Sequence, residues 1–305
     1  MMRRFTMTSS DGKTALAAYC LIPQNPRAMV QISHGMCEYF LRYEGFAEYL
    51  ASHGFIVFGH DHLGHGSSAA TPEDLGFTAS KGGAGMLIED VHSLSLEMKA
   101  QYPHLPLFLF GHSMGSFISR AVMEIYGEDY AGSVICGTGG PETPAAAGKA
   151  LASLLIKLKG ERHRSAFLRG VAFAGYNKKY EKGCDKNAWL TRDTAVVEKY
   201  NADPLCAYTF TLRGYRDLFR LVEHVSREEW AKKYPAELPT LVISGEMDPV
   251  GSWGKGVRAV ADRLQKAGVK DVTLTLYPEM RHEILNELGR EQVWSDIEQW
   301  MEKKL

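Results

Sequence analysis

The chain has 305 residues, of which 45% are hydrophobic and 23% are charged, and its formal net charge is -1. This length allows one large domain or two small ones with a substantial core, and the near-neutral charge gives no reason to expect a nucleic-acid partner. The opening MMRRFTMTSSDGK has no apolar region behind its arginines, and no apolar run reaches membrane-spanning length, so we expect neither a signal peptide nor a spanning helix.

The cysteines indicate a reducing compartment. They are scattered, odd in number and without C-x-x-C spacing, which fits free thiols better than a disulfide framework. We therefore expect a cytoplasmic location. The five are Cys20, Cys37, Cys136, Cys184 and Cys206.

Strand and helix patterns alternate along the chain, without repeats or low-complexity segments. The predicted strands are residues 16–21, 28–32, 55–58, 107–110, 132–136, 240–244 and 272–276. The predicted helices are residues 43–52, 86–102, 116–126, 255–266 and 291–303. Short buried strands separated by amphipathic helices predict an α/β fold with a mostly parallel sheet covered on both faces.

The alternation stops between Pro141 and Ser226, where the pattern indicates helices and loops. We predict a core of residues 1–140 and 226–305 and a helical cap, or lid, of residues 141–225. The first cap helix, in KALASLLIKLKG, places Leu151, Leu154, Leu155 and Leu158 on one face. This face could pack on its own domain, line an acyl pocket or contact a lipid surface.

The stretch LFLFGHSMG, residues 107–115, predicts a nucleophile elbow. An apolar strand runs into Gly-His-Ser-Met-Gly, and a helical pattern follows. So tight a turn strains the backbone at Ser113 and requires small neighbours, here Gly111 and Gly115. The alternative is a serine in an ordinary glycine turn.

A serine hydroxyl needs a base, and the base needs a partner that fixes its tautomer. Asp248 follows the strand pattern TLVIS, and His282 follows the last strand pattern, VTLTLYPE. The order Ser, Asp, His is the one expected for this architecture. Glu246 is the rival acid and Glu279 a remoter one.

The tetrahedral intermediate also needs donors for its oxyanion. The backbone N–H of Met114, the residue after the nucleophile, is one candidate, and that of Met36, in the loop QISHGMCEY, is the other. Gly35 would let this loop approach the carbonyl closely.

Two glycine-containing segments suggest other chemistry. GHDHLGHG, residues 59–66, holds His60, Asp61, His62 and His65, which are potential metal ligands, but no second cluster with ligand spacing accompanies it. KGGAG, residues 81–85, could cradle a phosphate, but it lacks the Gly-Lys-Ser/Thr ending of a P-loop. We expect no metal and favour a flexible loop at KGGAG.

Taken together, these motifs resemble those of the monoacylglycerol lipase and lysophospholipase branch of the α/β-hydrolases, of bacterial type. The resemblance covers nearly the whole chain. It rests on HGMCEYFLRY, FGHDHLGHGSS, LFGHSMGS, LVISGEMDPVG, YPEMRHEILNE and the cap segment NADPLCAYTFTLRGY. One departure is Tyr39, where family members often have a second histidine.

The resemblance implies an α/β-hydrolase fold, with Ser113 as nucleophile, Asp248 as acid, His282 as base, and Met36 and Met114 as amide donors. It also suggests substrate contacts at Gly35, Glu38, Leu151, Leu154 and Leu155. The expected function is a cofactor-free serine ester hydrolase that cleaves monoacylglycerols or lysophospholipids, with transient membrane contact through the cap. The alternatives are a short-chain carboxylesterase or thioesterase, an amide or peptide hydrolase and, more remotely, a non-catalytic binding module.

Overall fold

The computed structural model describes residues 1–141 and 144–305. Eight strands form one sheet in the order β1-β2-β4-β3-β5-β6-β7-β8. β2 pairs antiparallel with both β1 and β4, and all other neighbours pair in parallel. The strands are β1 (Arg3–Thr8), β2 (Ala15–Leu21), β3 (Ala28–Ser33), β4 (Phe55–His60), β5 (Leu107–His112), β6 (Gly132–Cys136), β7 (Thr240–Gly245) and β8 (Val272–Tyr277).

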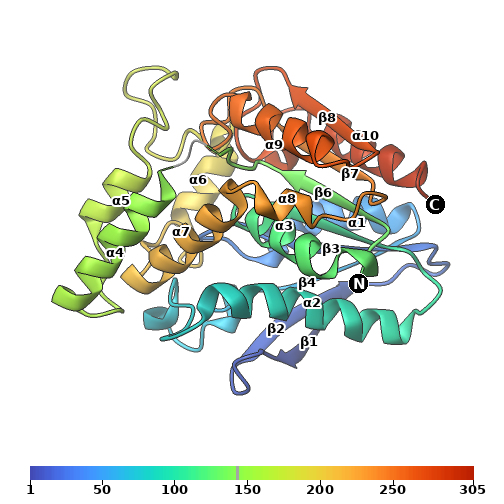
Figure 1. Cartoon of the computed structure of the whole chain (residues 1–305), viewed down its shortest axis with the longest axis horizontal. Helices are drawn as coiled ribbons and strands as arrows, with labels where there is room; N and C mark the ends of the chain where they lie inside the picture. Colours follow the sequence, from blue (N-terminus) through green and yellow to red (C-terminus); the bar gives the residue numbers. More distant parts are fainter. Residues whose placement is uncertain (142–143) are drawn as a thin grey trace.

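Different helices cover the two faces of the sheet (Figure 1). One core cluster contains side chains of α2 (Gly83–Gln101), α3 (Met114–Tyr126), α8 (Glu229–Lys232) and α9 (Lys255–Lys266). The other contains side chains of α1 (Glu44–Ser52) and α10 (Arg290–Glu302). The 3-10 helices are η1 (Phe40–Tyr43), η2 (Gly66–Ser68), η3 (Pro72–Asp74), η4 (Gly127–Asp129) and η5 (Ile284–Asn286).

The predicted α/β fold is confirmed. Each strand and helix predicted from the sequence is present, because continuous burial of the inner strands and apolar spacing on the helices, such as 257, 260, 261 and 264 on α9, give strong patterns. Sequence reasoning missed β1. This strand, RRFTMT, lies at the sheet edge and buries only Met7, so its pattern is weak.

Among the described residues, five helices lie between β6 and β7, and the first four of them lie in the segment predicted as a cap. These four are α4 (Ala145–Lys159), α5 (Ala166–Ala172), α6 (Thr194–Ala202) and α7 (Leu212–Ser226). Polar side chains set the starts of three of them: Ser165 caps α5, Asp193 caps α6 and Thr211 caps α7. None of the helices built from the described residues has the length and apolarity needed to cross a bilayer.

The first cap helix is oriented differently from expectation. α4 packs along α7, which in turn packs against α3 and α2, and Figure 1 shows α4 and α5 together at one end of the molecule. The face of α4 that packs against α7 consists of small residues. Ala145 and Ala152 are buried, and a Cβ at Gly148 would lie 2.9 Å from the Phe219 ring.

The four leucines of α4 therefore lie in different environments. Leu154 follows Ala152 by two residues, roughly 200° around the helix, and is 55% exposed, while Leu158 is 70% exposed. Leu155 is half-buried and packs against the main core cluster, whereas Leu151 lines the cavity described below. The expected acyl contacts at Leu154 and Leu155 are thus corrected: on this helix the leucine that faces the cavity is Leu151.

Candidate active site

The elbow at Ser113 has the strained geometry that its glycines predict. β5 ends at His112, Ser113 has φ +54°, and α3 begins at Met114. A positive φ is costly for a residue with a side chain and persists only where the surroundings enforce it. Gly115 is required here because a Cβ at this position would collide with the Ser33 carbonyl of the neighbouring strand.

Asp248 and His282 are in direct contact. The Asp248 carboxylate accepts from His282 Nδ1 at 3.0 Å, from the Ser244 hydroxyl at 2.9 Å and from the Val250 N–H at 2.8 Å. Both side chains are buried. Burial alone would raise the pKa of Asp248, but the charge and hydrogen bond of His282, with the other donors, hold that pKa below its ordinary value. An ionised acceptor at Nδ1 leaves Nε2 of His282 free to act as a base.

The His282 ring is held by its neighbours. The Trp189 ring lies 5.0 Å from it and the His112 ring 4.7 Å, centroid to centroid. A Cβ at Gly137 would lie 3.1 Å from the ring. His282 and Ser113 line the same cavity, whereas the rival acids point elsewhere: Glu246 is exposed, and Glu279, 81% exposed, pairs with Arg192.

The two candidate oxyanion donors flank the nucleophile. Met36 lies in the loop after β3, and Met114, as the first residue of α3, has an N–H without an acceptor one turn earlier in the helix. Both residues line the cavity. A Cβ at Gly35 would lie 3.1 Å from the Ser113 Cβ, so glycine allows this loop its close approach.

Glu38, predicted above to contact substrate, has its carboxylate occupied by protein donors. It accepts from the Gly35 N–H, the Tyr43 hydroxyl at 2.7 Å and Arg42 at 2.8 Å, and it lies 3.1 Å from His112 Nδ1. Although Glu38 borders the cavity, these bonds make it a support for the Gly35–Met36 turn. A substrate contact at Glu38 stays a prediction.

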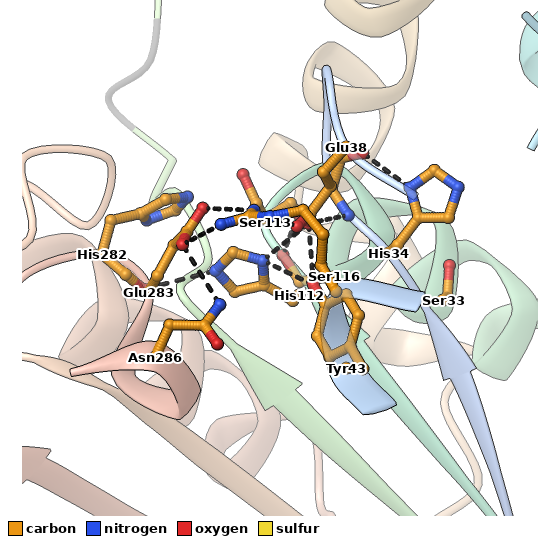
Figure 2. Close-up of polar contacts among 12 residues, drawn as sticks. Ser33, His34, Glu38, Tyr43, His112, Ser113, Ser116, His282, Glu283 and Asn286 are labelled. Atoms are coloured by element: carbon orange, nitrogen blue, oxygen red, sulfur yellow. Dashed lines mark hydrogen bonds and ion pairs between the residues drawn. The ribbon is translucent and has the colours of Figure 1, made fainter. Parts of the chain in front are cut away.

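Sequence reasoning missed the buried charge network to which Glu38 belongs. Arg42 also donates two hydrogen bonds of 2.7 Å to Glu283, the residue after His282. Burial would lower the pKa of His112, but the Glu38 carboxylate raises it, and His112 Nε2 lies 3.3 Å from the His282 carbonyl. Figure 2 shows these contacts joining the elbow, the Gly35 turn and the His282 loop. The available sequence signals were the i,i+4 spacing of Glu38 and Arg42 and the position of Glu283 beside His282.

The histidine-rich loop packs as a buried, uncharged cluster. Burial lowers the pKa of His60 to about 3 and that of His65 to about 4. His62 contacts Ser33 and His60 through its ring nitrogens, while Asp61 accepts from the Phe40 and Ser67 N–H groups. Within residues 1–141 and 144–305, no group of three or more His, Cys, Asp or Glu is arranged to hold a metal ion.

The expected flexible loop at KGGAG is wrong for its last three residues, because α2 begins at Gly83 and only Lys81 and Gly82 precede it. Gly82 adopts the left-handed conformation at the N-cap. A Cβ at Gly83 would collide with Thr78 and with the Asp217 carboxylate. A carboxylate packed against these glycines disfavours a phosphate there.

A cavity of about 1020 Å³ opens at Ser113, lined by core and cap residues together. Its apolar wall comes from Leu151 on α4, Leu218, Phe219 and Val222 on α7, and Phe117 on α3. Tyr39 is the position at which the chain departs from the family pattern. Its hydroxyl donates to Asp203 at 2.7 Å, which links the loop that contains Met36 to the segment predicted as a cap.

Comparisons with known proteins give the family of this chain. A family profile described as "Serine aminopeptidase, S33" matches residues 24–289. Human monoglyceride lipase is 27% identical over 98% of this chain and 90% of its own length, and a monoacylglycerol lipase of Mycolicibacterium smegmatis is 29% identical over 91% and 89%. A thermostable carboxyl esterase from Bacillus coagulans, solved with glycerol, is 31% identical, with a TM-score of 0.93 over 99% of this chain and 98% of that one. The chain therefore belongs to the serine aminopeptidase S33 family, in the monoacylglycerol lipase branch of the α/β-hydrolases.

Proposed function

We propose that this protein is a serine ester hydrolase that cleaves monoacylglycerols through an acyl-enzyme. The observation that carries this proposal is the buried Asp248–His282 pair, 3.0 Å apart, on the wall of the cavity that contains Ser113. A histidine whose tautomer is fixed by an ionised partner, on the wall of the same cavity as a strained serine, is an arrangement that can activate the hydroxyl.

The reaction proceeds in two balanced steps. Ser113 Oγ bonds to the ester carbonyl carbon while His282 Nε2 accepts the hydroxyl proton, and the carbonyl oxygen becomes an anion held by the N–H groups of Met36 and Met114. The intermediate collapses, the ester C–O bond breaks, and His282 returns the proton to the leaving alcohol. Water then attacks the acyl-enzyme, His282 again accepts a proton, and the fatty acid leaves as Ser113 regains its hydrogen.

The cavity wall supports an acyl substrate. Its apolar residues come from three helices, and the volume of about 1020 Å³ lies at the upper end of ordinary ligand pockets. The two curated relatives named above are monoacylglycerol lipases by name. A single long acyl chain on a small polar alcohol fits both observations.

The family description raises a second candidate, an aminopeptidase, which the site disfavours. Peptidases of this kind must bind an α-ammonium group, and a free carboxylate is the natural partner for it. Among the described residues, the two acidic ones that border the cavity, Glu38 and Glu283, both pair with Arg42. We therefore favour an ester over an N-terminal peptide bond.

The deciding experiment combines labelling with two substrate panels. We expect a fluorophosphonate probe to label Ser113, monoacylglycerols to be cleaved, and aminoacyl anilides to be left intact. A protein that cleaved the anilides and spared the esters would show that the aminopeptidase assignment is right.

We also propose that residues 141–225 act as a lid over the core of residues 1–140 and 226–305, and that the lid contacts membranes transiently. Four exposed apolar side chains lie on two cap helices: Leu154 and Leu158 on α4, and Phe167 and Val171 on α5. Lysines at 157 and 159 are exposed beside them. Apolar groups next to cations are typical of surfaces that bind lipid interfaces.

Vesicle sedimentation tests the membrane contact. Replacing Leu158 and Phe167 by Ser should lower binding to vesicles that contain anionic lipid several-fold, whereas Leu96→Ser, at an exposed leucine of α2, should not. Equal loss in both proteins, or none in either, would exclude this surface. A cytoplasmic location also remains a proposal, supported by five cysteines that are all free thiols.

A further inference from the structure

The cavity that contains Ser113 has a cationic side as well as an apolar one. Three cationic residues line it: Arg169 on α5, and Lys178 and Lys186 in the chain that follows. The Lys178 amine lies 4.3 Å from the centroid of the Trp253 ring, and Lys186 is exposed. Glu38 and Glu283 both have Arg42 as an ion-pair partner, so among the described lining residues the charged side chains without such a partner are the three cations.

Arg169 is the most informative of the three. It is only half-buried, and within the described part of the chain its guanidinium has no hydrogen bond or ion pair. Arg164, one turn earlier in the chain, instead donates to the Thr209, Pro72 and Glu73 carbonyls. Because Arg169 also lines the cavity, the donors of its unpartnered guanidinium are available to a molecule bound there.

Arg169 also lies within electrostatic reach of the oxyanion loop. Burial raises the pKa of the Cys37 thiol, and the Arg169 charge is the strongest influence in the opposite direction. Cys37 directly follows Met36, the candidate oxyanion donor. Arg169 and the proposed nucleophile Ser113 therefore line the same cavity, which is large enough for a substrate.

The segment that contains these three cationic residues also has a positive net charge. Residues 141–225 contain 15 Lys and Arg against 9 Asp and Glu, a net charge of +6, while the whole chain has a net charge of -1. The rest of the chain is therefore at −7, and the positive charge is concentrated in the segment that covers the nucleophile. Such a field attracts anions towards the cavity.

We propose that Arg169 is a specificity residue that binds a second, anionic group of the ester substrate, a phosphate or a carboxylate. The apolar wall takes the hydrocarbon chain, and the guanidinium forms charge-assisted hydrogen bonds with the anion, bidentate where the geometry allows. The preferred substrate is thus an anionic amphiphile. This inference rests on the proposed esterase function and extends it to the headgroup.

The test compares matched neutral and anionic esters below their micelle concentrations. Monodecanoylglycerol and monodecanoylglycerol phosphate place the charge on the alcohol side, while decyl butyrate and decyl hydrogen succinate place it on the acyl side. For the wild type we expect a higher kcat/KM with the anionic member of at least one pair, and that pair identifies where the charge sits. The preference should weaken as salt is added.

Arg169→Gln should lower kcat/KM for the preferred anionic ester about tenfold or more relative to its neutral partner, the range expected for a hydrogen bond to a charged group. Arg169→Lys should keep part of the preference because it retains the charge. Lys199→Gln, which removes an exposed cation of α6, is the matched control and should leave the ratio unchanged.

Several outcomes would overturn the inference. They are a wild type that prefers the neutral ester in both pairs, an Arg169→Gln protein with an unaltered ratio, or a Lys199→Gln protein that loses the ratio equally. In all three, ester hydrolysis by Ser113 stands. If the wild type cleaved no ester at all, the proposed function would fail together with the inference.

Discussion

The proposed core, residues 1–140 and 226–305, and the proposed cap, residues 141–225, hold the side chains of this candidate site in different ways. In the core, side chains with chemistry to perform are fixed by other polar groups, as when Asp248 accepts from Ser244, Val250 and His282. In the cap, the side chains that line the cavity are held by helix packing, as when Leu151 faces inward because Ala152 packs against α7. Hydrogen bonds therefore fix the positions of the proposed catalytic side chains. The rotation of α4 about its own axis decides which of its side chains line the cavity.

This contrast predicts large effects in the core, because a hydrogen-bonded reaction centre has no substitute for a lost member. Ser113→Ala should reduce ester turnover by about a millionfold, the loss typical of a triad serine. Turnover and fluorophosphonate labelling measure it, with circular dichroism to confirm folding. Labelling that persisted at another serine would place the nucleophile elsewhere.

A second change in the core separates the candidate acids. Asp248→Asn should lower kcat by about four orders of magnitude, because a neutral amide favours the wrong imidazole tautomer. Glu246→Gln, at an exposed carboxylate two residues away, is the matched control and should be mild. A larger loss in the control would reverse the assignment.

A third change tests the charge network behind the site. Arg42→Gln leaves the buried Glu38 and Glu283 carboxylates without their shared cation, which should cost about 3–5 kcal/mol of unfolding free energy. Denaturant unfolding measures this, and kcat should fall because the Gly35–Met36 turn and the His282 loop lose their common support. The triple variant in which Gln also replaces Glu38 and Glu283 removes the unpaired charges and should recover stability. If Arg42→Gln alone unfolded like the wild type, the network would contribute little.

The same contrast explains what the sequence could predict. Ser113, Asp248 and His282 were recognisable as candidates because each follows a parallel strand at the carboxyl edge of the sheet, where position in the chain fixes position in space. The leucines of α4 share one stripe on a helical wheel, but which part of that stripe faces inward depends on α7, more than fifty residues later. No local pattern contains this information.

The charge network was equally hidden, because its members come from separate segments. Glu38 lies in the loop after β3, Arg42 lies in η1, His112 ends β5 and Glu283 follows β8. In a linear sequence, a buried carboxylate next to a catalytic histidine looks the same as a solvated one. Only tertiary contact shows that the Glu38 carboxylate accepts from the Gly35 N–H and so supports the loop before Met36.

The smallest expected effect concerns the cap, and it tests the rotation of α4. Each methylene that a substrate buries contributes about 0.8 kcal/mol, or roughly a fourfold gain in kcat/KM per carbon, until the pocket is full. Leu151→Ser should flatten this rise for long acyl esters while changing acetate esters little, because it removes part of the apolar wall. Leu154→Ser, at a leucine 55% exposed on the same helix, should leave the whole profile intact. Monomeric, water-soluble esters keep membrane contact out of the measurement. If Leu154→Ser flattened the rise and Leu151→Ser did not, the face of α4 that carries Leu154 would contact the substrate. The helix would then be rotated about its axis relative to the orientation described above.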